Sequence, residues 1–117
     1  KYSIMEQRLI QSEILNKIVE IILNISNKYN IKVDKIILFG SRARGDYNEY
    51  SDWDILLVTE DKVKYDIIIE MTVELSKEGI YSQIINVTKD HYEEYKDITG
   101  DISYMASSEG IILWSKQ

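Results

Sequence analysis

The 117-residue chain contains no cysteine and no proline. Without cysteine it can form no disulfide, no zinc–thiolate site and no thiol nucleophile. No apolar run approaches the roughly 18 residues that a membrane-spanning helix requires. The amino-terminal segment has one polar face and does not resemble a secretory signal, so we expect a cytoplasmic location.

Histidine occurs once, and acidic residues outnumber basic ones. His91 lies in a polar segment, where it is either a general base or, as we favour, a solvent-exposed surface residue. The formal net charge is −6, whereas a protein that grips a nucleic-acid backbone usually has a basic face. We therefore expect no grip on nucleic acid, and we favour a free nucleotide as the ligand.

The hydrophobic pattern predicts alternating helices and strands. Ser3 and Glu6 form a capping-box pattern, and apolar residues from Leu9 to Tyr29 recur at helical spacing, which predicts a helix over about 4–29 that covers the core. The other expected elements are a strand over 33–39, a short helix from 41 to 46, a strand over 52–59, a helix over 62–77, a strand over 80–87, helices over 89–97 and 101–109, and a strand over 111–114.

This order predicts an α/β (α+β) fold class, with a small mixed sheet and helices mainly on one face. The chain has no internal repeat, low-complexity tract or linker composition. We therefore expect residues 1–117 to form one domain, with the amino-terminal helix (about 4–29) followed by a core (about 33–117).

Two aspartates stand at the start of the second predicted strand. Asp52 and Asp54 are two residues apart, so on a strand both carboxylates would point to one face, while Trp53 would point the other way into the core. Two carboxylates on one face suit a hard divalent cation such as Mg²⁺. The alternative is an ordinary turn-capping aspartate beside a solvated strand end.

A glycine turn follows the first predicted strand. Gly40 has no Cβ, so the backbone can approach a ligand closely, and the N–H groups that follow could hold phosphate oxygens. Ser41 would contribute its hydroxyl, or would cap the short helix instead. Arg42 and Arg44 could neutralise a triphosphate, or could pair with acidic side chains nearby. Tyr50, in the loop that follows, could contact a base.

Together these residues closely resemble the signature of minimal nucleotidyltransferases of the DNA polymerase beta superfamily. The sequence Gly40-Ser41-Arg42-Ala43-Arg44-Gly45 matches the family pattern G-S-x-A-R-G, and Ser51-Asp52-Trp53-Asp54 matches S-D-x-D. The resemblance implies the polymerase beta-like nucleotidyltransferase fold and the transfer of a nucleoside monophosphate, expected to be AMP from ATP, to a hydroxyl acceptor with Mg²⁺ as cofactor.

The resemblance also implies roles for individual residues and a partner. Asp52 and Asp54 would be catalytic residues and metal ligands. The nucleotide-binding residues would be Gly40, Ser41, Arg42 and Arg44. The partner would be a HEPN-domain protein, in a toxin–antitoxin system where AMP is added to a tyrosine of the toxin.

The chain departs from the family pattern at one position. Active members usually carry a third acidic residue on the next strand, but the predicted strand 80–87 has no carboxylate, and Ser82 or Gln83 takes the place. The two-metal site would then be incomplete. This favours, as an alternative, a catalytically impaired module that binds nucleotide and docks on a partner. A third interpretation, a small-molecule nucleotidyltransferase, would need an oligomer to build its acceptor pocket.

Overall fold

The computed structural model describes residues 2–117, which build a four-stranded mixed sheet. Its strands follow the order β3-β2-β1-β4. β2 and β3 run parallel, whereas β1 is antiparallel to both of its neighbours. The strand bounds are β1 (Val33–Phe39), β2 (Trp53–Thr59), β3 (Ser82–Thr88) and β4 (Ile111–Ser115).

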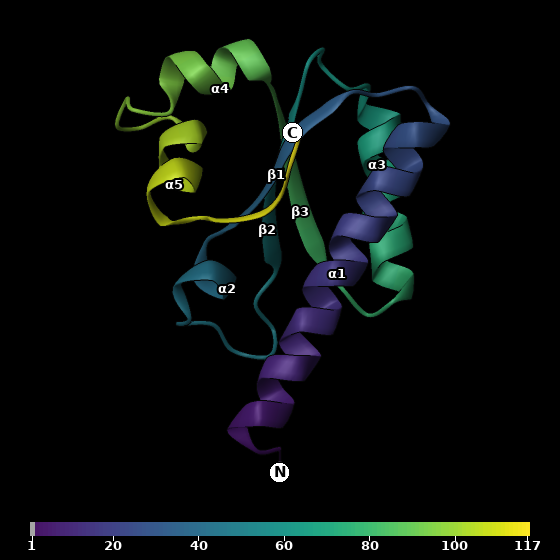
Figure 1. The fold of residues 1–117 in the computed structure, drawn as a ribbon, viewed down its shortest axis with the longest axis vertical. Coiled ribbons are helices and arrows are strands. Elements are labelled where there is room, and N and C mark those ends of the chain that lie inside the picture. The colour runs from purple at the N-terminus through teal and green to yellow at the C-terminus, as the bar shows by residue number, and fades with distance from the viewer. Residues whose placement is uncertain (1) are drawn as a thin grey trace.

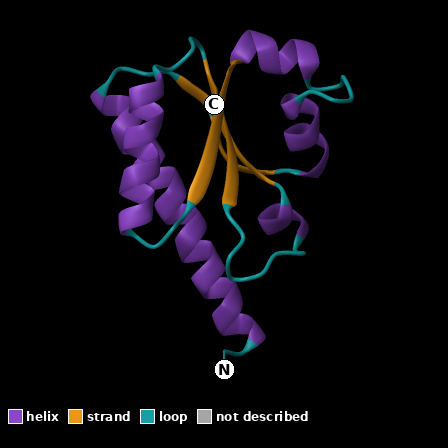
Figure 2. Cartoon of the chain, turned by 180° about the vertical axis from the view of Figure 1, so that it is seen from behind, coloured by secondary structure: helices purple, strands orange, loops and turns teal. Residues whose placement is uncertain are grey.

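Five helices in the described part of the chain accompany the sheet. They are α1 (Ile4–Lys28), α2 (Ser41–Arg44), α3 (Tyr65–Lys77), α4 (Lys89–Tyr95) and α5 (Ile102–Glu109). The two longest, α1 and α3, cover one face, and the short α4 and α5 lie on the other (Figures 1 and 2). The predicted element order is confirmed. The long helices cover one face of the sheet, and the two short helices α4 and α5 lie on the other.

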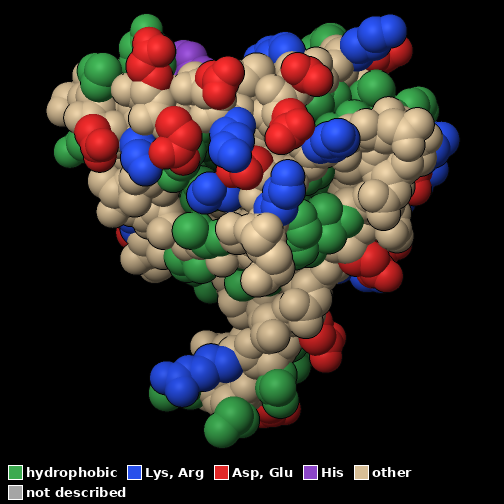
Figure 3. Space-filling view, turned by 45° about the horizontal axis from the view of Figure 1, so that its top comes forward, with side chains coloured by type: hydrophobic (Ala, Val, Ile, Leu, Met, Phe, Trp, Pro, Cys, Tyr) green, Lys and Arg blue, Asp and Glu red, His purple; other side chains and the backbone are tan. Residues whose placement is uncertain are grey.

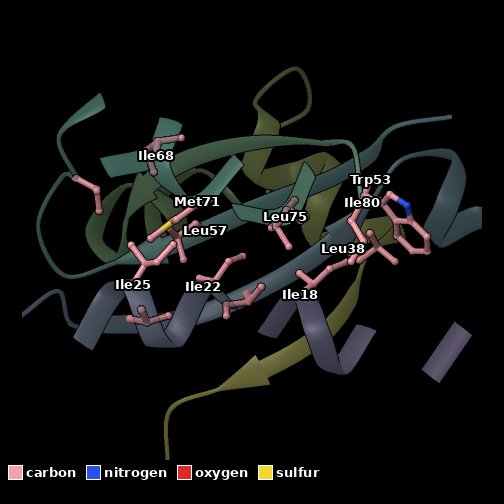
Figure 4. Packing of buried hydrophobic residues seen from close by; sticks show 14 residues of the cluster. Ile18, Ile22, Ile25, Leu38, Trp53, Leu57, Ile68, Met71, Leu75 and Ile80 are labelled. Atoms are coloured by element: carbon pink, nitrogen blue, oxygen red, sulfur yellow. The ribbon is translucent and has the colours of Figure 1, made fainter. Parts of the chain in front are cut away.

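Alternate residues of the central strands feed two hydrophobic clusters. Ile36 and Leu38 of β1 join the cluster under α1 and α3 (Figure 4), whereas Ile37 and Phe39 join the cluster under α4 and α5. Trp53 is 5% exposed and belongs to the first cluster, as predicted. By strand alternation its neighbour Asp54 therefore points to the face of α4 and α5.

The amino-terminal capping box of α1 forms as predicted. The Ser3 hydroxyl accepts from the Glu6 N–H at 3.1 Å, and the Ser3 N–H donates to the Glu6 carboxylate at 3.0 Å. The expectation that α1 covers the core from Leu9 onward is wrong, because the first turns of the helix project beyond the sheet (Figure 1). Leu9 is 58% exposed, and full burial begins at Ile18.

Several predicted boundaries are also corrected; among them, the strand expected over 80–87 spans Ser82–Thr88. β2 begins at Trp53, so Asp52 precedes the strand. The third helix begins at Tyr65 instead of near Lys62, because the segment before it is held against β3. The Val63 N–H donates to the side-chain oxygen of buried Asn86 at 2.8 Å, and this bond replaces a first helical turn. Among residues 2–117, no helix combines the length and hydrophobicity needed to cross a bilayer.

Candidate active site

The end of β1 and the start of β2 bring Gly40 against Asp54. The antiparallel register pairs Phe39 with Asp54, which places the next residue, Gly40, beside the aspartate side chain. Gly40 has φ +76°, and a Cβ at this position would collide with the Asp54 carboxylate. Only glycine therefore allows the carboxylate to lie on this turn.

The turn leads directly into α2. Gly40 is the residue that precedes the helix, and its carbonyl accepts from the N–H groups of Ala43 and Arg44 at 3.0 Å each. Ser41 is the first helical residue, so the alternative role of Ser41 as the helix cap is wrong. The half-buried Ser41 thus follows directly on the residue that packs against Asp54.

The two aspartates occupy different environments. Asp52 is exposed on the loop before β2, whereas Asp54 is half-buried within the strand, so the strand-alternation argument for a shared face does not apply to the pair. Even so, they are close enough to influence each other. Burial raises the pKa of Asp54 above its ordinary value, the negative charges of Asp52 and Glu109 add to this, and the Arg44 guanidinium opposes it.

These carboxylates supply some, but not all, of the ligands that a hard divalent cation needs. Asp52 and Asp54 offer carboxylate oxygens, the donors that Mg²⁺ prefers, and a bound cation would oppose both the burial and the repulsion that raise the Asp54 pKa. Among residues 2–117, however, no three or more His, Cys, Asp or Glu side chains gather in a metal-binding arrangement. The remaining ligands would have to be phosphate oxygens and water.

The third acidic position of the family pattern can now be assigned. In the parallel register between β2 and β3, Gln83 pairs with Asp54, and Ser82 pairs with Trp53. Gln83 therefore lies beside Asp54 on the same face of the sheet, and Ser82 lies on the other face. A neutral amide stands where the pattern has a carboxylate.

Arg44 makes two ion pairs at the mouth of this turn. Its guanidinium lies 3.1 Å from the Glu109 carboxylate and 3.3 Å from the Asp46 carboxylate. Glu109 also accepts a hydrogen bond from the Gly40 N–H at 3.3 Å. The last residue of α5 is thereby joined to the glycine turn.

Sequence reasoning missed Glu109. It lies 69 residues from Gly40 in the chain, and no local pattern marks it. The one usable signal is the antiparallel pairing of β4 with β1, in which Ile111 lies opposite Leu38. Continuing this register two residues past the pair brings Glu109 beside Gly40. That pairing cannot be read from periodicity alone.

Arg42 faces away from the Arg44 ion pairs. Its Nε and Nη2 atoms donate to the Ser51 carbonyl at 3.2 and 3.0 Å. The guanidinium also lies over the rings of Tyr47, at 4.4 Å, and Trp53, at 4.5 Å. In this arrangement Arg42 braces the loop that precedes Asp52, and its predicted contact with nucleotide stays a prediction.

His91 is a half-buried residue of α4. Its Nε2 atom is 3.2 Å from the Asp101 carboxylate, and its ring stacks on Tyr95 at a centroid distance of 4.5 Å. The expectation of a solvent-exposed histidine is thus wrong in part, because the side chain links α4 to α5.

Tyr50 is 86% exposed in the loop before Asp52, and its predicted contact with a base stays a prediction.

Comparison with known proteins decides the family. The profile of the nucleotidyltransferase domain matches residues 11–107. The chain belongs to the nucleotidyltransferase family. A candidate protein adenylyltransferase of Methanocaldococcus jannaschii is 37% identical over 96 residues, which is 81% of this chain and 92% of the relative. The predicted resemblance to minimal nucleotidyltransferases is confirmed.

Solved structures share the fold of this nucleotidyltransferase. A structure of the MntA–HpeT toxin–antitoxin complex has a TM-score of 0.63 at 19% identity and covers 88% of this chain and 74% of its own. The tri-AMPylated HEPN toxin of Shewanella oneidensis in complex with MNT antitoxin gives 0.57 at 22% identity, covering 92% and 74%. These likenesses confirm the predicted polymerase beta-like fold.

Proposed function

We propose that this nucleotidyltransferase moves AMP from ATP to a hydroxyl acceptor, a tyrosine of a HEPN-domain toxin in the expected case. The observation that carries the proposal is the close approach of the Asp54 carboxylate to Gly40. The carboxylate lies so near this turn that residue 40 has no room for a side chain. The name of the M. jannaschii relative and the AMPylated toxin of the S. oneidensis complex support the choice of AMP and of the partner. ATP as the donor makes the cytoplasm the expected location.

The residues around the glycine turn would bind the triphosphate. The N–H groups of Gly40 and Ser41, the Ser41 hydroxyl and the Arg44 guanidinium would donate to phosphate oxygens. The acceptor oxygen then attacks the α-phosphorus, the bond from that phosphorus to the β-phosphate bridging oxygen breaks, pyrophosphate leaves, and the acceptor proton passes to a base. Catalysis would consist mainly of positioning and charge neutralisation.

Asp52 and Asp54 would hold Mg²⁺ in this proposal. When bound, the cation supplies positive charge to the attacking and leaving oxygens of the in-line displacement. Asp54 suits this role because its carboxylate is half-buried, held in place against Gly40, and repelled by its acidic neighbours. Asp52 would reach the same cation from the loop that Arg42 braces.

The acceptor would dock beside the projecting part of α1. A hollow of about 560 Å³ separates this helix from the loop that carries Tyr47, and Ile10 and Arg42 also line it. Ile4, Met5 and Leu9 of the projecting part are exposed. Apolar side chains are visible on this projection in Figure 3. Over the body of the molecule in that view, acidic and basic side chains are interspersed, which suits a protein acceptor better than a nucleic-acid backbone.

Transfer of label tests the proposal. The protein is incubated with α-phosphate-labelled ATP, Mg²⁺ and lysate of the native host, in parallel with Asp54→Asn and with Asp61→Asn, a control that alters an exposed carboxylate outside the site. We expect a labelled protein band with the wild type and Asp61→Asn, and a loss of at least about 100-fold with Asp54→Asn. A band of equal intensity with Asp54→Asn would contradict the proposal.

A second candidate function is a binding module without transfer activity, and the neutral Gln83 beside Asp54 favours it. The two functions predict different responses to Gln83→Asp. If the natural site is already sufficient, the substitution changes transfer little. If the natural chain only binds nucleotide, no label is transferred by the wild type, ATP binding remains measurable by calorimetry, and Gln83→Asp gains transfer.

A further inference from the structure

Glu109 occupies two of the donors that the proposed function reserves for phosphate. Its carboxylate accepts from the Gly40 N–H at 3.3 Å and from Arg44 Nη1 at 3.1 and 3.2 Å. A carboxylate and a phosphate oxygen both bind backbone N–H groups and guanidinium through charge-assisted hydrogen bonds. The glycine turn therefore already binds an anion in this structure, and that anion belongs to the chain itself.

Two other features of the surroundings repel the Glu109 carboxylate. It is the last residue of α5, where the helix dipole places partial negative charge. It also lies near enough to Asp54 for the two carboxylates to repel each other. The contacts with Gly40 and Arg44 are thus the interactions that hold the side chain in this place, and a ligand that takes those donors would release it.

We propose that Glu109 is an internal competitor for the phosphate site, which a polyphosphate group must displace before it binds. The inference rests on the proposed function, because it assigns the same donors to the triphosphate. The need to displace Glu109 lowers the apparent affinity for nucleotide. The apparent affinity equals the intrinsic affinity multiplied by the fraction of molecules in which Glu109 has left the site. The same need also means that a weak anion, such as a single carboxylate or inorganic phosphate, competes poorly with the chain's own side chain.

Asp46 provides a matched control. It too pairs with Arg44, at 3.3 Å, so its removal takes one negative charge from the same guanidinium. The Gly40 N–H donates to Glu109 and not to Asp46. A difference between Asp46→Asn and Glu109→Gln therefore separates occupation of the donors from a general gain in positive potential.

The test is calorimetric titration of the wild type, Glu109→Gln, Glu109→Ala and Asp46→Asn with inorganic tripolyphosphate in chelator, and separately with ATP and Mg²⁺. We expect Glu109→Gln to bind tripolyphosphate about tenfold more tightly than the wild type, Glu109→Ala at least as tightly, and Asp46→Asn less than about threefold more tightly. Circular dichroism establishes that each variant is folded. Glu109→Ala serves because the amide of Glu109→Gln can still accept from Gly40.

Three results would overturn the inference. The first is unchanged tripolyphosphate affinity in both folded Glu109 variants. The second is an equal gain in Asp46→Asn, which would reduce the effect to general electrostatics. The third is a loss of ATP–Mg²⁺ binding in both Glu109 variants, which would make Glu109 a metal ligand. By contrast, tighter tripolyphosphate binding without any ATP binding would uphold the role of Glu109 and contradict the proposed nucleotide function.

Discussion

Gly40 and Asp54 form the contact on which the whole site depends. A half-buried carboxylate that lies against the backbone of a left-handed glycine is an arrangement that costs stability, because burial disfavours its charge and the backbone conformation excludes other residues. Proteins retain such arrangements mainly at functional sites. At the scale of single residues, both costs can be measured.

Gly40→Ala should destabilise the protein by more than backbone strain alone. Gly79→Ala is the control, because Gly79 has the same φ of +76° but open space where a Cβ would lie. We expect about 1 kcal/mol from Gly79→Ala and at least about 2 kcal/mol from Gly40→Ala in urea unfolding. Equal losses would show that Asp54 does not press against the turn.

Asp54→Asn should make the metal-free protein more stable at pH 7. A carboxyl whose folded pKa is raised above its ordinary 3.8 is harder to ionise in the folded state, so wild-type stability falls as pH rises through that window. The asparagine amide does not ionise, so it avoids the cost of a buried negative charge. In urea unfolding with chelator, the Asp54→Asn midpoint should exceed that of the wild type at pH 7, and the difference should shrink towards pH 3. A lower midpoint at pH 7 would contradict the account.

At the scale of elements, the site is assembled from two antiparallel pairings of β1. β2 brings Asp54 to one side of the glycine turn, and β4, with α5 before it, brings Glu109 to the other. The loop between α2 and β2 carries Asp52, and Arg42 reaches back from α2 to the Ser51 carbonyl to fix that loop. The charged groups of the site thus come from α2, the loop after it, β2 and the end of α5.

Arg42→Lys should loosen the loop that carries Asp52. Lysine keeps the charge but loses the paired donors and the planar group that lies over Tyr47 and Trp53. We expect a loss of about 1–2 kcal/mol in unfolding free energy and about tenfold in AMP transfer, while Arg8→Lys on exposed α1 leaves the unfolding free energy unchanged. If Arg42 contacts nucleotide instead, ATP affinity will fall with no change in unfolding.

The two ends of α1 should respond differently to truncation of a side chain. Ile22 is completely buried under the sheet, so Ile22→Ala should cost about 2–5 kcal/mol. Leu9 is mostly exposed, so Leu9→Ala should stay within about 0.5 kcal/mol in urea unfolding. A large loss from Leu9→Ala would mean that the projecting end packs on the body in solution.

At the scale of the molecule, local patterns predicted what depends on neighbours in sequence. The capping box at Ser3, the element order and the Gly40 and Asp54 positions all follow from short-range spacing. Contacts between distant segments were not predictable in the same way. Periodicity marks Leu9 as apolar without saying whether anything covers it, and no pattern joins Glu109 to Gly40 across 69 residues.

The register between β2 and β3 also determines which residue of β3 lies at the third acidic position. Sequence spacing left Ser82 and Gln83 both open, because a shift of one residue in register exchanges the faces of a strand. The parallel pairing of β3 with β2 selects Gln83. The strand beside Asp54 therefore offers an amide at this place, where the family pattern has a carboxylate.

One measurement tests the central claim, adenylyl transfer, most directly. Matched reactions contain ATP labelled on either the α- or the γ-phosphate, with Mg²⁺ and the native host lysate. The account predicts label on an acceptor protein from the α-phosphate alone, and γ-label released as pyrophosphate. γ-label on the acceptor would indicate phosphoryl transfer, and no label from either would leave the chain a binding module; both results would contradict adenylyl transfer.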